Sequence, residues 1–554
     1  MITLNNINLS SIDLSGIDLR GVKLGLGGRG GGSSDGFPVL PGDVTRWHFG
    51  GLTNEMMAAM DDPRIEDADH KGRFLSFKNF AWKGMSGVGG YGDENYQTFY
   101  KFTLDDYVFI ASPPSVEYMN FTFRVTGLQP GNKLTLAFLG TTNTVYGTWD
   151  KDGIYTVNSA VVEVGKPVYF YNGYGSTRGE FTIEILPLYP GFILGDGVDD
   201  FAVTEKELNF EDTYTVYTAF IPFQNNPIRN MILCGADSKK TFSMQYSSLV
   251  YVSFIAGNNY YINANFVNGL NLFACKRNGN NICIKNLLTN KVVTGTCGDW
   301  VENAGLYYLW KNATYASFAK AAIAGQTICN GYFSTDEDDE KVLNWYKKQY
   351  PWLFPDQAWT VVGKTNEDED RATIANITGN GNDLVLSNFG FIEGSGYNEE
   401  GEHAGYLVTD GVDDEIISAK RIQFADKFTI VGDWKFMEDR NDNAGLLKAN
   451  QIYIYNATTG MRIYLKQGSK NYPFSCKKIN ALTSDGWVYD EKWDKYKVYP
   501  IGSDIDISSR LFLGFYSSNF TKIALKNLGI YNDQLLSKDD CIKAYNYLQT
   551  LKAK

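Results

Sequence analysis

The feature that most constrains the fold of this chain is a long internal repeat. The segment GFILGDGVDDFAVTEKELNFEDTYTVYTAFIPF, which begins at Gly191, aligns without a gap with GYLVTDGVDDEIISAKRIQFADKFTIVGDWKFM, which begins at Gly405. The stretch DGVDD is identical in the two copies, and the apolar positions around it keep their character. Because such a repeat marks one structural unit present twice, we predict two copies of one module, over residues 191–355 and 356–554.

The two copies also end alike. STDEDDEKVLNWYKKQ begins at Ser334 and SKDDCIKAYNYLQTL begins at Ser537, and each has Ser first, acidic residues next and helical spacing after them. Serine caps free N–H groups at the start of a helix, and acids there interact favourably with the helix dipole. Strand-like sequence precedes both segments. We therefore expect each module to be a strand-rich body closed by a short C-terminal helix.

Alternating apolar and polar residues dominate the part of the chain before the repeat. Stretches such as FTFRVTGLQPGNKLTLAFLGTT show strand periodicity broken by turn residues, which predicts a separate β-sandwich domain at residues 37–190. The 36 Tyr, 34 Phe and 56 Gly favour pleated sheets and tight turns over long helices. The predicted fold class is mostly β: a multi-domain chain of antiparallel β-sandwich (jelly-roll) modules in tandem after a short N-terminal anchor segment.

The N-terminal segment, residues 1–24, carries a different repeat with a period of five residues. An Ile or Val begins each repeat and a Leu follows two positions later, at Ile2, Leu4, Ile7, Leu9, Ile12, Leu14, Ile17, Leu19, Val22 and Leu24. The pattern is similar to that of pentapeptide-repeat β-helices, although that family has a small residue where this chain has Ile or Val. Five repeats make only about one and a quarter coils, too few for a core of their own. We expect these side chains to be buried against another subunit as an assembly anchor, followed by a flexible Gly-rich tether at residues 25–36.

The modules resemble a known structural family. DGVDD after an apolar strand, a strand-rich body and the stretch RLFLGFYSSNFTKIALKNLGIYND before a capped helix together resemble concanavalin A-like lectin/glucanase, or laminin-G-like, jelly-roll modules. The segments ITGNGNDLVLSNF and ILPLYPGFILGDGVDD are similar to parts of structural proteins from phages and prophages that infect gut Bacteroidales. The resemblance covers residues from about 100 to 554. It implies two curved sheets per module, ligands held at rim loops or on the concave face, and a trimeric fibre.

The repeated DGVDD motif has two interpretations. Asp-Gly favours a tight turn and the following acids cap backbone groups, which makes the motif a structural corner. Alternatively the acids bind calcium, which prefers several carboxylate oxygens; they are Asp196, Asp199 and Asp200 in one copy and Asp410, Asp413 and Asp414 in the other. Adjacent acids in a strand point to opposite faces, so both can contact one ion only if the backbone bends between them. We expect the corner and no cofactor, with calcium as the alternative.

The chain lacks the sequence motifs of enzymes that share this fold. Glucanases of the family use Glu-x-Asp-x-x-Glu on one strand, and the nearest match has Glu337 and Asp339 but Val342 at the third position. Three histidines, His48, His70 and His403, are scattered, and no GxSxG elbow, P-loop or HExxH motif occurs. We therefore expect a protein that is not an enzyme.

Two aromatic-rich stretches are candidate carbohydrate-binding sites, because sugars stack their CH faces on aromatic rings and bond through hydroxyls to nearby polar groups. The stretch DGWVYDEKWDKYKVYP, from residue 485, contains Trp487, Tyr489, Trp493 and Tyr496. The stretch AGNNYYINANF, from residue 256, contains Tyr260 and Tyr261. The alternative for both is a hairpin whose aromatic side chains line the sandwich.

Bulk properties exclude some partners and lead to a functional hypothesis. A formal charge of −12 repels nucleic acid, no run of 18 apolar residues indicates membrane insertion, and the N-terminus has no secretory signal pattern. We expect a non-enzymatic phage virion structural protein, made in the host cytoplasm: a head or tail fibre or decoration subunit. It would bind other virion proteins through its N-terminus, form a homo-oligomer and present its modules to host-surface glycans. The alternative is a bacterial surface or secreted protein that binds or degrades glycans.

Overall fold

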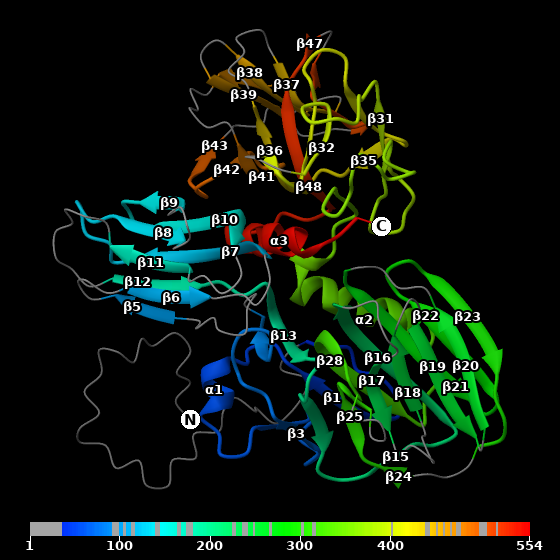
Figure 1. The fold of residues 1–554 in the computed structure, drawn as a ribbon. Coiled ribbons are helices and arrows are strands. Elements are labelled where there is room, and N and C mark those ends of the chain that lie inside the picture. Colours follow the sequence, from blue (N-terminus) through cyan, green and yellow to red (C-terminus); the bar gives the residue numbers. More distant parts are fainter. Residues whose placement is uncertain are drawn as a thin grey trace.

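Strands are the main element of this protein and form three β-sandwiches (Figure 1). The computed structural model describes residues 36–553 apart from residues 91–98, 103–106, 112–116, 139–143, 163–167, 173–180, 224–228, 235–241, 247–249, 257, 265–268, 301–303, 313–316, 400–402, 438–443, 450–451, 458–459, 466–467, 472–477, 498–506 and 517–518. The predicted anchor, residues 1–24, lies outside the described residues, as does nearly all of the tether. The predicted mostly-β, multi-domain fold class is confirmed.

The first module is a sandwich of two antiparallel sheets. One has the strand order β23-β22-β21-β16-β28-β13-β4, with β1 beside β13 on the same edge of β28. The other has the order β2-β3-β14-β25-β17-β18-β19-β20. The strands are β1 (Asp43–His48), β2 (Arg64–Glu66), β3 (Phe74–Lys78), β4 (Gly87–Gly89), β13 (Tyr189–Asp196), β14 (Phe201–Thr204), β16 (Thr213–Pro222), β17 (Arg229–Cys234), β18 (Phe242–Tyr246), β19 (Val250–Ala256), β20 (Asn258–Ala264), β21 (Asn271–Asn278), β22 (Asn281–Asn286), β23 (Lys291–Thr296), β25 (Tyr307–Leu309) and β28 (Lys320–Asn330).

The second module repeats this topology strand for strand. Its sheets have the orders β32-β33-β48-β36-β41-β42-β43, with β29 on β48, and β30-β31-β34-β45-β37-β38-β39-β40. The strands are β29 (Gln357–Thr360), β30 (Thr373–Ile374), β31 (Leu384–Ser387), β32 (Gly396–Asn398), β33 (Tyr406–Val408), β34 (Glu415–Ser418), β36 (Phe428–Phe436), β37 (Ala444–Ala449), β38 (Ile452–Ala457), β39 (Gly460–Leu465), β40 (Gly468–Asn471), β41 (Ile479–Thr483), β42 (Trp487–Asp490), β43 (Lys495–Lys497), β45 (Phe512–Leu513) and β48 (Ile523–Asn532).

A shared irregularity shows how closely the modules match. The register between β16 and β28 shifts between Ala219 and Phe220, and the register between β36 and β48 shifts between Asp433 and Trp434. These two positions correspond when the repeat is aligned. A β-bulge bends a strand and increases its twist, so both modules curve their central strands at the same point.

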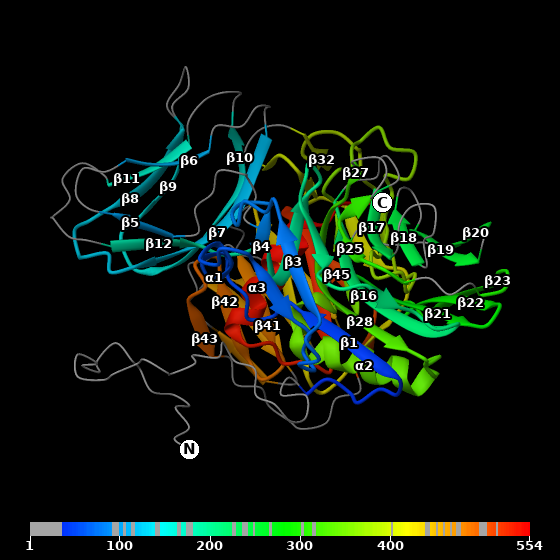
Figure 2. The ribbon, with the colours of Figure 1, turned by 90° about the horizontal axis from the view of Figure 1, so that it is seen from below.

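The third sandwich is inserted into the first module. Residues 99–185 form two four-stranded sheets, β10-β7-β12-β5 and β6-β11-β8-β9. The strands are β5 (Phe99–Phe102), β6 (Tyr107–Ala111), β7 (Glu117–Thr126), β8 (Leu134–Phe138), β9 (Thr144–Trp149), β10 (Gly153–Val162), β11 (Val168–Asn172) and β12 (Phe181–Ile185). Seen from below, this insert lies on one side of the body and the sheets of the first module extend to the other (Figure 2).

The expected domain at residues 37–190 does not coincide with the sheets. Strands β1 to β4 pair with β28, β14 and β13, so residues 43–89 belong to the first module. The insert begins after β4 and ends before β13, and those two strands are hydrogen-bonded neighbours. In the second module only residues 399–405 join the equivalent strands β32 and β33. Strand periodicity reveals strands but does not show which distant strand each one pairs with, and this is why the boundary was misplaced.

The helices form where the sequence indicated. Helix α2 (Asp336–Gln349) and helix α3 (Lys538–Thr550) follow the last strand of each module, and a short helix α1 (Asn54–Ala58) follows β1. Ser537 caps α3 as expected, whereas α2 is capped by Thr335, one residue after Ser334, in a capping box with Asp338. A 3-10 turn, η3 (Pro351–Leu353), leads into the second module. Among the described residues no helix is long and apolar enough to span a membrane.

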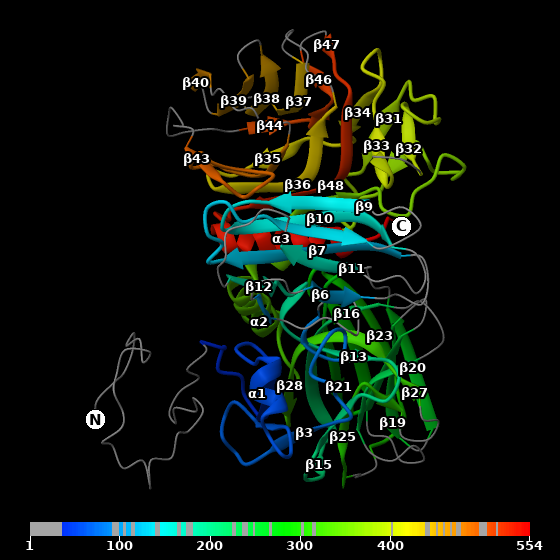
Figure 3. The same ribbon diagram turned by 60° about the vertical axis from the view of Figure 1, so that its left-hand side comes forward.

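Helix α3 lies at the centre, where the three sandwiches meet (Figures 1 and 3). Asn546 Oδ1 accepts a 2.5 Å hydrogen bond from the Thr122 hydroxyl of the insert. The Tyr547 hydroxyl accepts one of 3.0 Å from the backbone N–H of Leu270 in the first module. An apolar cluster around α2 and α3 draws side chains from all three sandwiches, in addition to the separate core of each module. Because the three parts share buried surface, they form one body.

Candidate functional site

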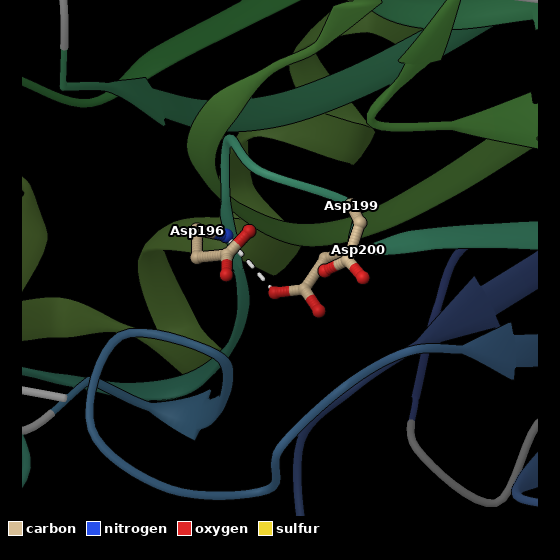
Figure 4. Close-up of side chains that lie close together, drawn as sticks. All are labelled: Asp196, Asp199 and Asp200. Carbon is tan, nitrogen blue, oxygen red and sulfur yellow. Dashed lines mark hydrogen bonds between the residues drawn. The ribbon is translucent and has the colours of Figure 1, made fainter. Parts of the chain in front are cut away.

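Each DGVDD motif forms a tight corner between two strands, and the carboxylates of its first and last Asp accept hydrogen bonds from the backbone of the corner. In the first module the N–H of Asp196 donates to Asp200 Oδ2 at 3.0 Å (Figure 4). The N–H of Val198 donates to Asp196 Oδ1 at 2.7 Å. In the second module the N–H of Asp410 donates to Asp414 Oδ2 at 2.7 Å. These bonds are those expected of an Asx turn, so they support the corner interpretation.

The last acid of each motif is buried, and burial raises its pKa. Asp200 and Asp414 are 0% and 1% exposed. Burial raises the pKa of Asp200 to about 7 and the pKa of Asp414 to about 6, and hydrogen bonds from backbone N–H groups and from Ser86 or Ser395 oppose the rise. The Ser395 hydroxyl donates to Asp414 Oδ1 at 3.1 Å. In the second module both oxygens of the Asp414 carboxylate therefore accept hydrogen bonds within the corner.

The three acids of each corner also lie close enough to share a cation. One carboxylate oxygen from each of Asp196, Asp199 and Asp200 lies within 4.8 Å of the others, and the same holds for Asp410, Asp413 and Asp414. The turn after the first Asp supplies the bend that adjacent acids need to face one ion. An acidic cluster of this size is common without an ion, and the hydrogen bonds above already use the buried acid of each set.

A second repeated motif, which sequence analysis missed, supports both corners. NFAWKGMSG at residues 79–87 aligns without a gap with NFGFIEGSG at residues 388–396. The Asn79 amide donates to the backbone oxygen of Asp199 at 3.1 Å, and the Asn388 amide donates to that of Asp413 at 3.0 Å. The first motif lies much farther from its DGVDD than the second does. That unequal spacing is the sequence pattern that reveals the insert.

The backbone of this second motif is equally constrained in both copies. Asn79 and Trp82 have φ of 67° and 53°, and Asn388 and Phe391 have φ of 66° and 51°. Non-glycine residues adopt such angles rarely, and asparagine tolerates them better than most. Two positive φ values at the same spacing in both modules show that this loop has one conformation that the fold uses twice.

Half of the predicted aromatic site in the second module is internal. Trp493 is 0% exposed and packs edge-on against Tyr545 of α3, with ring centroids 5.6 Å apart. Tyr489 is 5% exposed and belongs to the same cluster, and burial raises its pKa to about 12. Neither ring offers a face to a ligand from solvent. These two residues are therefore packing residues, but they contact α3 and its cluster and do not line the sandwich interior as the hairpin alternative expected.

The other half of that site is at the surface. Trp487 is half-buried on β42, and the ammonium groups of Lys495 and Lys497 lie 4.8 and 4.4 Å from its ring centroid. Lys497 also lies 3.6 Å from Asp485. Tyr496, on the edge strand β43, donates its hydroxyl to Asp490 Oδ2 at 3.2 Å. The exposed remainder of the predicted site is thus one indole ring with two cations and a carboxylate beside it.

The other predicted residues lie elsewhere in the first module. Tyr260 and Tyr261 lie in β20, on the outer edge of a sheet of the first module, and their side chains are outside the described part of the structure. Asp339, from the nearest match to a glucanase motif, is 2% exposed in α2. Its carboxylate pairs with Lys276 at 2.7 Å and with Lys285 at 3.1 Å, and the Tyr217 hydroxyl donates to it at 2.9 Å. This group therefore joins α2 to the sheet below it.

Comparisons with known proteins find no family model that matches the sequence and no curated protein that matches it. Solved structures with a similar arrangement include one from work on cell entry of botulinum neurotoxin type C, at 8% identity, 61% coverage of this chain, 87% of that chain and a TM-score of 0.26. The binding domain of Paraclostridial Mosquitocidal Protein 1 has 8% identity, coverages of 62% and 91%, and a TM-score of 0.29. Trypanosoma rangeli sialidase has 11% identity, coverages of 56% and 60%, and a TM-score of 0.24. At TM-scores this low, no function of this chain follows from these proteins.

Proposed function

We propose that this chain is a non-enzymatic, glycan-binding structural subunit of a phage virion, a head or tail fibre or decoration protein. The observation that carries glycan binding is the half-exposed ring of Trp487 with Lys495 and Lys497 over it. An aromatic face stacks on the CH face of a sugar ring, and each ammonium group brings three hydrogen-bond donors. Two cations beside one ring favour a glycan that carries acidic substituents.

Electrostatics supports an acidic ligand at this hairpin even though the whole chain is acidic. Asp485 balances only part of the positive charge, because it lies 3.6 Å from Lys497, and the Lys495 ammonium is directed to the indole ring. A cation held over an indole by about 0.5–1 kcal/mol is available to exchange that contact for a carboxylate or sulfate group. The two ammonium groups at the ring therefore favour anionic sugars, against the repulsion of Asp490, Glu491 and Asp494 on the same hairpin and of the remaining surface.

Glycan arrays with the full chain test this proposal. We expect binding to acidic glycans, such as polysaccharides that contain uronic acids, with loss of binding in Trp487→Ala and a decrease of at least tenfold in the double variant Lys495→Gln with Lys497→Gln. Trp300→Ala is the matched control, because Trp300 is also half-buried with a cation, Arg277, 4.9 Å from its ring. Equal binding by the Trp487 and Trp300 variants would contradict the site.

The virion role is supported by the order of segments along the chain. Ten regularly spaced apolar residues in residues 1–24 precede a Gly-rich tether, and a rigid body of three sandwiches follows. An apolar segment that cannot close its own core gains stability by packing on a partner. We expect that deletion of residues 1–24 leaves the body folded but abolishes incorporation into particles, and that mass spectrometry of purified virions detects the full chain. Unchanged incorporation would contradict the anchor, and absence from virions would contradict the virion role.

A further inference from the structure

A cavity of about 290 Å³ lies at the seam between the two modules. One wall comes from the first module, through Leu270, Asn286 and Thr289 and through Lys347 of α2. The opposite wall comes from the segment that enters the second module, including Asp356 and Asn380. The floor is apolar, with Phe354 and Tyr547 among its residues. The cavity exists only where the two modules meet, because its lining residues come from segments far apart in the sequence.

Polar groups around the cavity retain unused hydrogen-bonding capacity. Lys347 is exposed, and its ammonium group forms no ion pair or hydrogen bond with any described residue. The Thr289 hydroxyl likewise has no partner in the described chain, and its backbone N–H is held by Asn286 Oδ1. Asp356 Oδ2 accepts from the N–H of Asn532 at 2.5 Å, and the carboxylate also interacts with its own backbone N–H and with the charge of Lys347. A cation, a hydroxyl and a carboxylate oxygen therefore border one hollow.

The cavity is preformed because its walls are fixed by close contacts. Tyr547 is held by the N–H of Leu270, and a methyl group added at Gly269 would lie 2.6 Å from the Tyr547 oxygen, so only glycine permits α3 to approach this strand. At the rim the two modules are also in close contact, because a Cβ atom added at Gly379 would lie 3.3 Å from Thr289 Cγ2. Rigid walls reduce the ordering entropy that binding costs, which favours a specific ligand.

We propose that the seam cavity binds a small neutral saccharide, a hexose or a disaccharide. The half-buried apolar side chains of Leu288, Leu343 and Pro355 line the cavity and suit the CH face of a sugar ring, and the rim presents both donors and acceptors for hydroxyl groups. Lys347 and Asp356 carry opposite charges, so the site has no net preference for an anion. The volume is near the lower end of the range of about 300–1,000 Å³ for ligand pockets, which limits the ligand to one or two rings. This inference rests on the proposed glycan-binding role and assigns to it a second site, separate from Trp487.

Ligand-observed NMR titration of the full chain tests the cavity. The probes are glucose, galactose, mannose, N-acetylglucosamine, maltose, cellobiose and lactose. Thr289→Trp places an indole at the mouth of the cavity, and Lys347→Trp does the same from another element of this wall, at an exposed position of α2. Lys348→Trp is the matched control, because Lys348 is also exposed but lines only a neighbouring hollow of about 450 Å³. The unfolding midpoint of each variant shows that it is folded.

We expect at least one probe to bind, and both blocking variants to weaken its binding at least tenfold, while Lys348→Trp and Trp487→Ala leave it unchanged. Binding that survives both blocking variants overturns the inference, as does the absence of binding by every probe. Loss of neutral-sugar binding in Trp487→Ala would place the sugar on the hairpin and overturn the seam site. If acidic glycans still bind through Trp487 in any of these cases, the proposed glycan-binding function stands and only the seam site is disproved. Failure of the seam site can therefore be distinguished from failure of the proposed function.

Discussion

The hydroxyl of Tyr547, in the last helix of the chain, accepts a hydrogen bond of 3.0 Å from the backbone N–H of Leu270, 277 residues earlier. This bond joins the second module to the first across buried surface. The helix that closes one module thus also completes the packing of the other. The following predictions depend on this shared seam and on the repeated corners.

Removal of the Tyr547 hydroxyl is expected to destabilise both modules together. Tyr547→Phe leaves the buried N–H of Leu270 without its acceptor, which costs about 1–3 kcal/mol in the free energy of unfolding. Urea unfolding followed by circular dichroism should show one transition at a lower midpoint. Lys151→Ala is the control, because the Lys151–Asp494 pair between the insert and the second module is solvent-exposed and is worth about 0–1 kcal/mol. Two separate transitions in the native chain would contradict the shared seam.

The two tryptophans of one hairpin should respond in opposite ways. Trp493 is buried against α3, so Trp493→Ala is expected to lower the free energy of unfolding by about 3–5 kcal/mol. Trp487 is half-buried, so Trp487→Ala is expected to cost clearly less while it abolishes glycan binding. Denaturant titration of both variants distinguishes packing from recognition. A similar stability loss in the two would show that Trp487 is structural.

The buried acid of the first corner should make stability depend on pH. Burial disfavours the charge of Asp200 and raises its pKa to about 7 in the folded protein, from an ordinary value of 3.8. The folded state therefore binds more protons between these values, and the contribution of Asp200 to stability falls as pH rises from about 4 to 7. We expect Asp200→Asn to become more stable relative to the native chain as pH increases over this range. Urea midpoints in EDTA at pH 5 and pH 8 check this, and a constant difference would contradict it.

Calcium should not change the stability of the corners if their role is purely structural. Ligand that binds only the folded state at 100 times its Kd adds about 2.7 kcal/mol to the free energy of unfolding. We expect equal melting temperatures in millimolar calcium and in EDTA. A saturable increase that disappears when Asp196 and Asp410 are replaced by Asn would contradict this expectation and assign the carboxylate clusters to a cation.

The insert should be removable because its ends lie on paired strands. β4 and β13 are hydrogen-bonded neighbours, and the equivalent strands of the second module are joined by a short loop. Replacing residues 90–190 by residues 399–404 is expected to leave both modules folded. The melting temperature should fall, because the bond from Thr122 to Asn546 and part of the shared cluster are lost. Loss of cooperative unfolding would show that the insert is needed for the first module to fold.

The sequence by itself determined what local pattern and repetition encode. The gapless match around DGVDD defined two modules, Asp-Gly specified the turns, and the capped segments after Ser334 and Ser537 specified two helices. The motifs NFAWKGMSG and NFGFIEGSG held the additional information that residues before 90 belong to the first module. Their unequal distances from the DGVDD motifs marked the insert, since one module has a long segment where the other has a short connection.

Only the tertiary structure decided which strands pair, which aromatic rings are buried and where the modules meet. Strand periodicity is the same whether a strand pairs with its neighbour or with one 287 residues away, as in the pairing of Asp43 with Asn330. Trp487 and Trp493 lie in one short hairpin, and packing against α3 buries Trp493 fully while Trp487 stays half-buried. The seam cavity likewise has walls from both modules, so its geometry follows from packing between distant segments and from no sequence pattern.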